Sequence, residues 1–428
     1  MTNKPVSLTS KNHWAVAINN ASNKFQLLDL LANGPVPPEF EELRGLQGAL
    51  FSKLELVRFI DEEERHGAKT LTKDTPQSLK SMSTGEQKKA LLKYILAADP
   101  DFIVLDNPFD NLDNESQAQL AKSLQEISKH TQLVQIISRK TDLLPFVTRF
   151  VTLDRAVLKT FGSISELEHF LATPSKPIFQ ENIPKPLNTD RFEDEVLIDL
   201  KNIAISYDGK PILKNINWKI RPGSFWQLVG KNGSGKTTLL SMITGENSKG
   251  YGQDLYIFGK KKGSGESIWD IKKRIGYFTP SMIDKFTGHH SAINMLISGL
   301  TDSVGLYLRP TEVQLQLAKE WLELINMWGL KDVYFHDLSM GQQRLLMTVR
   351  AMVKHPLLLI LDEPTAGLDD KSAALFVALA NKIAQESKTA IIFVSHRKEP
   401  GLRPQYVFQL EQTKHGSTGK IIKTSQNK

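Results

Sequence analysis

Gly230-Lys231-Asn232-Gly233-Ser234-Gly235-Lys236-Thr237 matches every fixed position of the phosphate-binding pattern G-x-x-x-x-G-K-[ST]. Apolar residues 225–229 predict a buried strand before it, and residues 238–244 predict a short helix that ends at Gly245. A loop in this setting turns backbone N–H groups and a helix N-terminus towards an anion. Lys236 is suited to the β- and γ-phosphates of a nucleoside triphosphate, and the Thr237 hydroxyl is suited to Mg²⁺. The predicted nucleotide contacts are Gly230, Lys231, Asn232, Gly233, Ser234, Gly235, Lys236, Thr237 and Thr238.

The composition is that of a globular protein of two or three domains, with 428 residues, 40% of them apolar and 24% charged. No apolar run reaches the ~18–20 residues of a membrane span, and residues 1–10 lack the apolar core of a signal peptide. The absence of cysteine excludes disulfides and thiolate metal sites. The net charge of +7 permits an anionic partner such as nucleic acid, but the basic residues are spread along the chain. We therefore expect a cytoplasmic protein and leave open a peripheral location at the inner face of the membrane.

Residues 14–31 form a distorted copy of the phosphate loop and its flanking elements. Trp14, Lys24 and Phe25 lie 212 positions before Trp226, Lys236 and Thr237. In this copy Ile18, Ala21 and Asn23 replace the three glycines, and Phe25 offers no oxygen to Mg²⁺. The sequence predicts that this first site does not turn over ATP.

The copy continues at a second constant offset of 256 positions, which indicates an internal repeat. Ser83-Thr84-Gly85-Glu86 matches residues 339–342, Asp106 matches Asp362, and Asp113 matches Asp369. The change of offset makes the first copy 44 residues shorter between its loop and its Ser-x-Gly element (256 minus 212).

The repeat predicts the division into domains. Prolines 174, 177, 184 and 186 lie in a polar connector. We expect a shortened, degenerate ATPase-like domain at residues 1–172, a proline-rich linker at 173–194 and a complete ATPase domain at 195–428.

Two predicted strands of the second half end in polar residues. Residues 357–361 read as a buried parallel strand followed by Asp362 and Glu363, and residues 390–394 as a second strand followed by Ser395 and His396. Because ligands bind at the carboxyl ends of such strands, Asp362 is a candidate Mg²⁺ ligand and Glu363 a candidate base for the attacking water. His396 is a second catalytic candidate, although a lone histidine is more often structural. Tyr207 either stacks on the base or belongs to the core.

The second half resembles the ATP-binding cassette (ABC) ATPases. The resemblance rests on residues 230–238, 338–342, 362–364 and 367–369 and on His396, in this order, and covers nearly the whole half. Residues 269–277 are similar to ModF-like tandem-cassette proteins associated with molybdate transport and photorepair. The implied fold is α/β, with two P-loop NTPase cassettes that have mainly parallel sheets and helical subdomains, the first one shortened.

In that family two cassettes pair head to tail, and each nucleotide lies between one phosphate loop and the other cassette's Ser-x-Gly signature. The resemblance implies that one site is competent and that ATP and Mg²⁺ are its cofactors, with pairing inside a monomeric chain. In the opposite site Asn107 replaces the catalytic carboxylate, and Arg139 stands where a histidine is expected. The implied signature over the competent site is Ser83, Thr84, Gly85 and Glu86, and that over the defective site includes Ser339, Gly341 and Gln342.

Three classes of function remain open from the sequence. The first is a cytoplasmic ATPase, free or bound to another protein, with one competent composite site. The second is the energising subunit of a membrane permease. The family usually has a glutamine shortly after residue 275, and such a glutamine would favour this class. The sequence has Thr279-Pro280-Ser281 in this segment. The third is a nucleic-acid or translation factor, of which the tandem type carries a long charged helical linker that is absent here.

Overall fold

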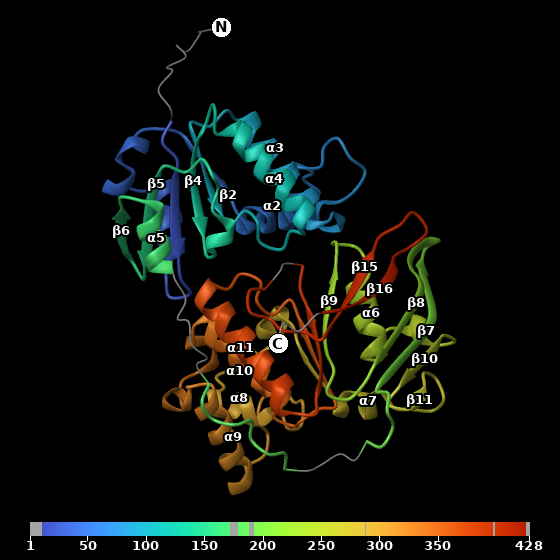
Figure 1. Cartoon of the computed structure of the whole chain (residues 1–428). Coiled ribbons are helices and arrows are strands. Elements are labelled where there is room, and N and C mark those ends of the chain that lie inside the picture. Colours follow the sequence, from blue (N-terminus) through green and yellow to red (C-terminus); the bar gives the residue numbers. More distant parts are fainter. Residues whose placement is uncertain (1–10, 172–178, 188–191, 287, 397–398, 425–428) are drawn as a thin grey trace. The chain divides into compact units, whose positions relative to one another are not determined.

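The computed structural model describes residues 11–171, 179–187, 192–286, 288–396 and 399–424. Four segments named above lie outside them: residues 1–10, the boundary at residue 172, and residues 173–178 and 188–191 of the linker. The chain contacts form two compact units, one built mainly from the chain up to residue 174 and the other mainly from the rest (Figure 1). Among the described residues, no helix is long and apolar enough to cross a membrane.

The first unit is built around a six-stranded, mainly parallel sheet in the order β2-β3-β4-β1-β5-β6. Only the β5–β6 pair is antiparallel. Central strands are buried along their length because helices cover both faces, which is why they read as continuous apolar runs. The elements are β1 (Trp14–Ile18), α1 (Lys24–Ala32), η1 (Pro38–Leu43), β2 (Gly48–Phe51), α2 (Lys53–His66), η2 (Leu79–Ser81), α3 (Thr84–Ala97), β3 (Phe102–Asp106), α4 (Asn114–Ile127), β4 (Gln132–Ile137), η3 (Lys140–Asp142), β5 (Arg149–Asp154), β6 (Val157–Phe161) and α5 (Ile164–Leu171).

The second unit repeats this sheet in the order β12-β13-β14-β9-β15-β16 and adds an antiparallel sheet, β11-β10-β7-β8. Its strands are β7 (Ile198–Tyr207), β8 (Lys210–Ile220), β9 (Phe225–Gly230), β10 (Asp254–Ile257), β11 (Lys260–Lys261), β12 (Ile275–Phe278), β13 (Leu358–Asp362), β14 (Ala390–Val394), β15 (Tyr406–Glu411) and β16 (Thr418–Lys423). Its helices are α6 (Lys236–Ile243), η4 (Ser248–Gly250), α7 (Ile268–Arg274), η5 (Pro280–Lys285), α8 (Ala292–Ser298), α9 (Glu312–Leu324), η6 (Trp328–Leu330), η7 (Phe335–Asp337), α10 (Met340–Met352) and α11 (Asp370–Glu386).

The predicted fold class is confirmed, because the two six-stranded sheets have the same strand order. The shortening is also visible within the described residues. Between α1 and α3 the first unit has η1, β2, α2 and η2, whereas between α6 and α10 the second unit has two further strands and helices α7, α8 and α9. The antiparallel sheet was not predicted, although β8 alternates between buried and exposed residues in a way typical of a strand covered on one side.

Two apolar layers enclose the main sheet of the second unit. On one face the helices from α8 to α11 bury a large cluster that includes Trp321 and Phe376. On the other face the antiparallel sheet and α6 bury a second cluster, in which Trp218 of β8 stacks on Phe408 with ring centroids 4.3 Å apart. Phe179, in the described part of the predicted linker, is buried in the first of these clusters. The carboxyl ends of β9, β13 and β14 are thereby held at one sheet edge.

Candidate functional site

The phosphate loop of the second unit connects β9 to α6, as predicted. Its glycines are required by space as well as by backbone conformation. A Cβ on Gly230 would lie 2.5 Å from Ser234 Oγ, and a Cβ on Gly235 would lie 2.7 Å from Leu213 Cδ2. Gly233 and Gly235 have φ values of 77° and 92°, in the left-handed region that glycine adopts most readily. Gly235 caps α6 without a side-chain hydrogen bond, so side-chain capping does not occupy this helix N-terminus.

Lys236 is buried at the first position of α6 and turns back over its own loop. Its ammonium donates hydrogen bonds to the carbonyl oxygens of Gly230, at 2.8 Å, and Lys231, at 3.1 Å. Thr237 follows it in the exposed part of the first helical turn. The loop therefore carries a cation and a hydroxyl beside an open helix N-terminus, which is a set of groups suited to phosphate.

The predicted carboxylates and His396 lie together at the edge of the same sheet, because β13 pairs with β14 and β14 with β9. Glu363 has a φ of 48°, and its backbone N–H donates to Val394 O at 3.0 Å. Its Oε1 lies 3.2 Å from His396 Nδ1. The Nε2 atom of His396 is buried and has no hydrogen-bond partner among the described residues. The imidazole of His396 thus orients the carboxylate of Glu363 through Nδ1.

Asp362 has a neighbour that sequence reasoning missed. The hydroxyl of Tyr277, on β12, donates to Asp362 Oδ2 at 3.2 Å. Burial raises the pKa of Asp362 and the negative charge of Glu363 raises it further, while Tyr277 and Lys236 act in the opposite direction. The sequence analysis did not predict the strand that contains Tyr277, and pairing of this strand with β13 is what brings the tyrosine beside Asp362.

The corresponding loop of the first unit is built differently. Asn23 stands in the place of Gly235, with a φ of −81°, and its side chain accepts a hydrogen bond from Gln26 N. Lys24 Nζ lies 3.0 Å from both carboxylate oxygens of Asp106. Phe25, in the place of Thr237, is 59% exposed. The N-terminus of α1 is therefore capped by the side chain of Asn23, and Lys24 is paired with Asp106, the counterpart of Asp362.

The cap provides a test of this difference. Replacing Asn23 by alanine should lower the free energy of unfolding of the first unit by about 1 kcal/mol, the usual cost of losing an N-cap side chain. ATP turnover should not change, because the sequence predicts that the loop to which Asn23 belongs does not turn over ATP. Urea unfolding of the full chain and a steady-state ATPase assay measure both quantities. Asn33→Ala, at the C-cap of the same helix, is the matched control; equal stability of parent and Asn23→Ala would contradict the assignment.

The sheet register corrects one prediction for the first unit. Asp106 pairs with Ile136 as Asp362 pairs with Val394, so the residue two positions later is Ser138 in the first unit and His396 in the second. Ser138, and not Arg139, therefore occupies the histidine position. Asn107 Oδ1 accepts hydrogen bonds from Ser138 N at 3.0 Å and from Ser138 Oγ at 3.2 Å. An amide and a hydroxyl thus replace the carboxylate and imidazole of the second unit.

The two signature segments have the same local structure. Ser83 caps α3 and Ser339 caps α10, each in a capping box with the residue three positions later. Ser83 N and Oγ donate to Glu86 Oε2 at 2.8 Å and 2.7 Å, and Ser339 N donates to Gln342 Oε1 at 2.9 Å. Each signature therefore presents a helix N-terminus, but that of the first unit carries a carboxylate.

Tyr207 lies at the end of β7, at the turn of the β7–β8 hairpin. The ring is 38% exposed, which excludes the core alternative. Its hydroxyl accepts a hydrogen bond from Asn247 Nδ2 at 2.8 Å. Stacking of this ring on a nucleotide base stays a prediction.

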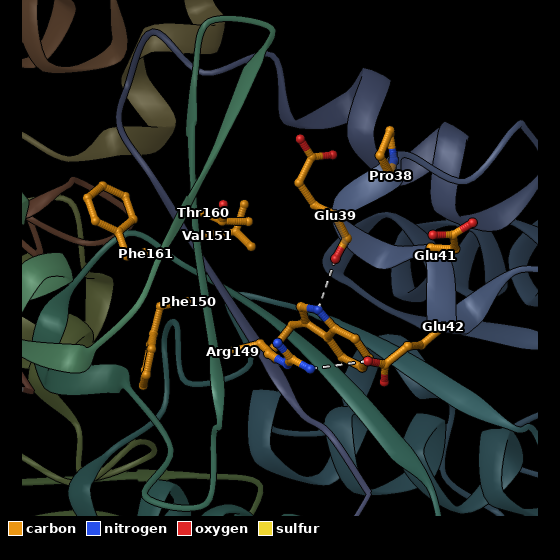
Figure 2. Close-up of a pocket in the computed structure, with 10 residues that line it drawn as sticks. Pro38, Glu39, Glu41, Glu42, Arg149, Phe150, Val151, Thr160 and Phe161 are labelled. Carbon is orange, nitrogen blue, oxygen red and sulfur yellow. Dashed lines mark hydrogen bonds and ion pairs between the residues drawn. The ribbon is translucent and has the colours of Figure 1, made fainter.

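The first unit also contains a pocket of about 370 Å³, away from the predicted site (Figure 2). It lies between η1 and strands β1, β5 and β6, where Trp14 Nε1 donates to Glu39 O and Arg149 pairs with Glu42. In Figure 2 the rings of Phe150 and Phe161 point away from Glu39 and Thr160. By strand register, Trp14 corresponds to Trp226 and Val151 to Phe408. In the second unit, Trp218 of the antiparallel sheet packs its ring against both Trp226 and Phe408. The described residues of the first unit contain no counterpart of this antiparallel sheet, and the pocket lies where such a sheet would pack.

Comparisons with known proteins agree with this geometry. A family model described as "ABC transporter" matches residues 213–366. The ABC transporter ATP-binding protein ModF of Escherichia coli is 33% identical over 92% of this chain and 90% of its own length. An uncharacterized ABC transporter ATP-binding protein of Schizosaccharomyces pombe is 32% identical over 76% of this chain and 66% of its own length.

A solved structure, a model of ribosome-bound archaeal Pelota and ABCE1, aligns with 96% of this chain and 75% of its own chain at a TM-score of 0.64. At 15% identity this likeness shows the fold alone. The ModF comparison spans both units, and the matched family model covers the phosphate loop, the second-unit signature and Asp362. This chain therefore belongs to the family of ABC ATP-binding proteins, with two cassettes in one chain as in ModF, and it is an ATPase.

Proposed function

We propose that ATP is bound and hydrolysed at one competent site, in the second unit, and that the first unit contributes its signature instead of a second ATPase site. The observation that carries this proposal is the contrast between two lysines. Lys24 forms an ion pair with Asp106 beside a capped helix, whereas Lys236 donates to carbonyls of its own loop beside an uncapped one. Only the second arrangement leaves the helix N-terminus open to phosphate.

The side chains of the second unit fit Mg²⁺ as the partner of ATP. Thr237 and Asp362 supply a hydroxyl and a carboxylate, the oxygen donors that this cation prefers. When bound, Mg²⁺ neutralises charge on the β- and γ-phosphate oxygens. Asp362 is partly buried beside a second carboxylate, that of Glu363, and both the burial and the neighbouring charge raise the pKa of Asp362. This local excess of negative charge supports a cation site here.

The remaining chemistry falls to Glu363 and His396. The Glu363 carboxylate accepts a proton from the water that attacks the γ-phosphate, in the role of general base. His396 holds that carboxylate through Nδ1 and offers its buried Nε2 to the transferred phosphoryl group. Lys236 supplies the point charge that positions the phosphates.

The first unit completes the site in this proposal. The capping box of α3 uses the backbone N–H groups of Ser83 and Glu86, and in this proposal those of Thr84 and Gly85, which the box does not use, stabilise charge on the γ-phosphate. Gly85 is the test position, because a Cβ there would already lie 3.3 Å from Ser116 Oγ. A longer side chain has to leave towards the exposed surface of the signature.

Gly85→Glu should therefore lower ATP turnover at the Lys236 site of the second unit by about 10²-fold, the scale for loss of a group that stabilises transition-state charge. The control is the double variant Lys24→Ala/Asp106→Asn, which removes both members of the ion pair and should retain activity. Steady-state ATPase rates are compared after circular dichroism confirms that both variants are folded. Full activity in Gly85→Glu together with loss of activity in the double variant would reverse the roles of the two units.

A further inference from the structure

Tyr277, in the second unit, contacts Asp362, the proposed metal ligand. The proposed function gives Tyr277 no role. Strand β12 lies at the edge of the main sheet and pairs in parallel with β13, with Tyr277 opposite Ile360. The side chain reaches forward along the sheet, and its hydroxyl donates to Asp362 Oδ2 at 3.2 Å. The remaining oxygen of Asp362 is not engaged by Tyr277.

The hydroxyl is a donor that stays protonated. Burial raises the pKa of Tyr277 well above its usual value, and the negative charge of Asp362 raises it further. The hydrogen bond from Tyr277 therefore fixes the direction of Oδ2 of Asp362.

The first unit contains a natural comparison for this contact. Leu50 of β2 pairs with Val104 in the register in which Tyr277 pairs with Ile360, so the first unit has an aliphatic side chain at the tyrosine position. There Asp106 is stabilised by the ammonium of Lys24. A cation cancels the charge of its carboxylate, whereas the neutral hydroxyl of Tyr277 leaves the charge of Asp362 in place. In the first unit the ion pair with Lys24 neutralises Asp106, which suits a site without a metal ion. In the second unit the neutral hydroxyl leaves Asp362 suited to bind a metal ion.

We propose that Tyr277 is a positioning residue for the metal ion of the ATPase reaction. It orients Asp362 through Oδ2 and leaves the second carboxylate oxygen to the cation or to a water that the cation coordinates. This inference rests on the proposed function of the second unit, since it assigns a role beside the same nucleotide. It adds a residue whose contribution is to metal affinity and not to nucleotide affinity.

The test separates these two affinities in the full chain. Binding of Mn²⁺ is titrated by electron paramagnetic resonance in the presence of a saturating non-hydrolysable ATP analogue, and binding of a fluorescent ATP analogue is titrated with EDTA. Tyr277→Phe removes only the hydroxyl. We expect its Mn²⁺ dissociation constant to rise about tenfold, the scale of one hydrogen bond to a charged group. Metal-free nucleotide affinity should stay within about twofold of the parent, because the contact is to a carboxylate and not to the nucleotide.

Tyr406→Phe is the matched control, since Tyr406 lies in the same sheet and stacks on Trp226 with ring centroids 4.6 Å apart. It should leave both affinities unchanged. An unchanged Mn²⁺ constant in Tyr277→Phe would overturn the inference, and so would an equal loss of metal-free nucleotide affinity, which would indicate a structural role. If the parent chain binds the nucleotide analogue but no Mn²⁺ with it, the metal assignment in the proposed function fails and Tyr277 loses its role. A parent that binds metal and nucleotide while Tyr277→Phe behaves identically overturns the Tyr277 inference alone.

Discussion

Lys236→Ala is expected to reduce ATP turnover by about 10³-fold or more and to weaken ATP binding, because it removes the point charge directed at the β- and γ-phosphates. Lys236 is buried beside the loop carbonyls that it contacts, so no other lysine of the loop replaces it easily. Alanine is well tolerated at a helix start and leaves the backbone of α6 unchanged. Titration of a fluorescent ATP analogue and a steady-state ATPase assay measure the two effects.

The control for this prediction comes from the first unit. Lys24→Ala alone would leave Asp106 without its ion-pair partner. Because the side chain of Asp106 is only 6% exposed, its uncompensated charge would lower the stability of the first unit. The double variant Lys24→Ala/Asp106→Asn avoids this cost and removes the lysine at the equivalent position. Equal turnover in Lys236→Ala and the parent would show that the second-unit loop is not where ATP is hydrolysed.

Glu363→Gln is expected to keep ATP bound and to slow hydrolysis by about 10²- to 10⁴-fold, the range for loss of a general base. Glutamine has the same length and can still accept a hydrogen bond from His396 Nδ1 at the 3.2 Å separation seen for Glu363. The backbone should also be preserved, because non-glycine residues already adopt the positive φ that Gln needs at this position: Glu363 itself and Asn107 at the equivalent position of the first unit. A single-turnover assay isolates the chemical step, and filter binding of labelled ATP measures retention.

Asn107→Ala is the matched control, at the equivalent position of the first unit. It breaks the hydrogen bonds to Ser138 and should leave the single-turnover rate unchanged. An unchanged rate in Glu363→Gln would mean that another group activates the water. A loss of ATP binding in Glu363→Gln would instead assign Glu363 to the binding of nucleotide or metal.

The local motifs were readable from the sequence because they depend on short-range chemistry. The predicted strands 225–229 and 390–394 correspond to β9 and β14, and the helix predicted to stop at Gly245 corresponds to α6. Their signals are a continuous apolar run, a glycine-rich loop and a glycine with positive φ, all within a few residues. The internal repeat was readable for the same reason, since equal spacing of fixed residues needs no tertiary information.

The error at Arg139 shows where this reading stops. Counting along the chain did not show whether one residue more or fewer precedes β4. The pairing of Asp106 with Ile136 settles this, because it places Ser138 two positions after Ile136, where Ser138 N donates to Asn107 Oδ1. A shift of one residue moves each side chain to the other face of a strand, so register decides which side chain reaches a site. The antiparallel sheet was missed for a related reason: in the pairing of β10 with β7, the paired residues lie 53 (254 minus 201) to 59 (257 minus 198) positions apart in the sequence.

The sequence by itself determined that this protein has an intact phosphate loop in its second half, a degenerate copy in its first and two signature segments. Each of these features is a set of residue types at fixed short spacing, which chain connectivity alone preserves. Only the tertiary structure decided that Lys24 pairs with Asp106, that Asn23 caps its own helix and that Tyr277 donates to Asp362. The lysine–aspartate and tyrosine–aspartate contacts join residues 82 and 85 positions apart, and they exist because parallel strand pairing brings the carboxyl ends of separate strands to one edge.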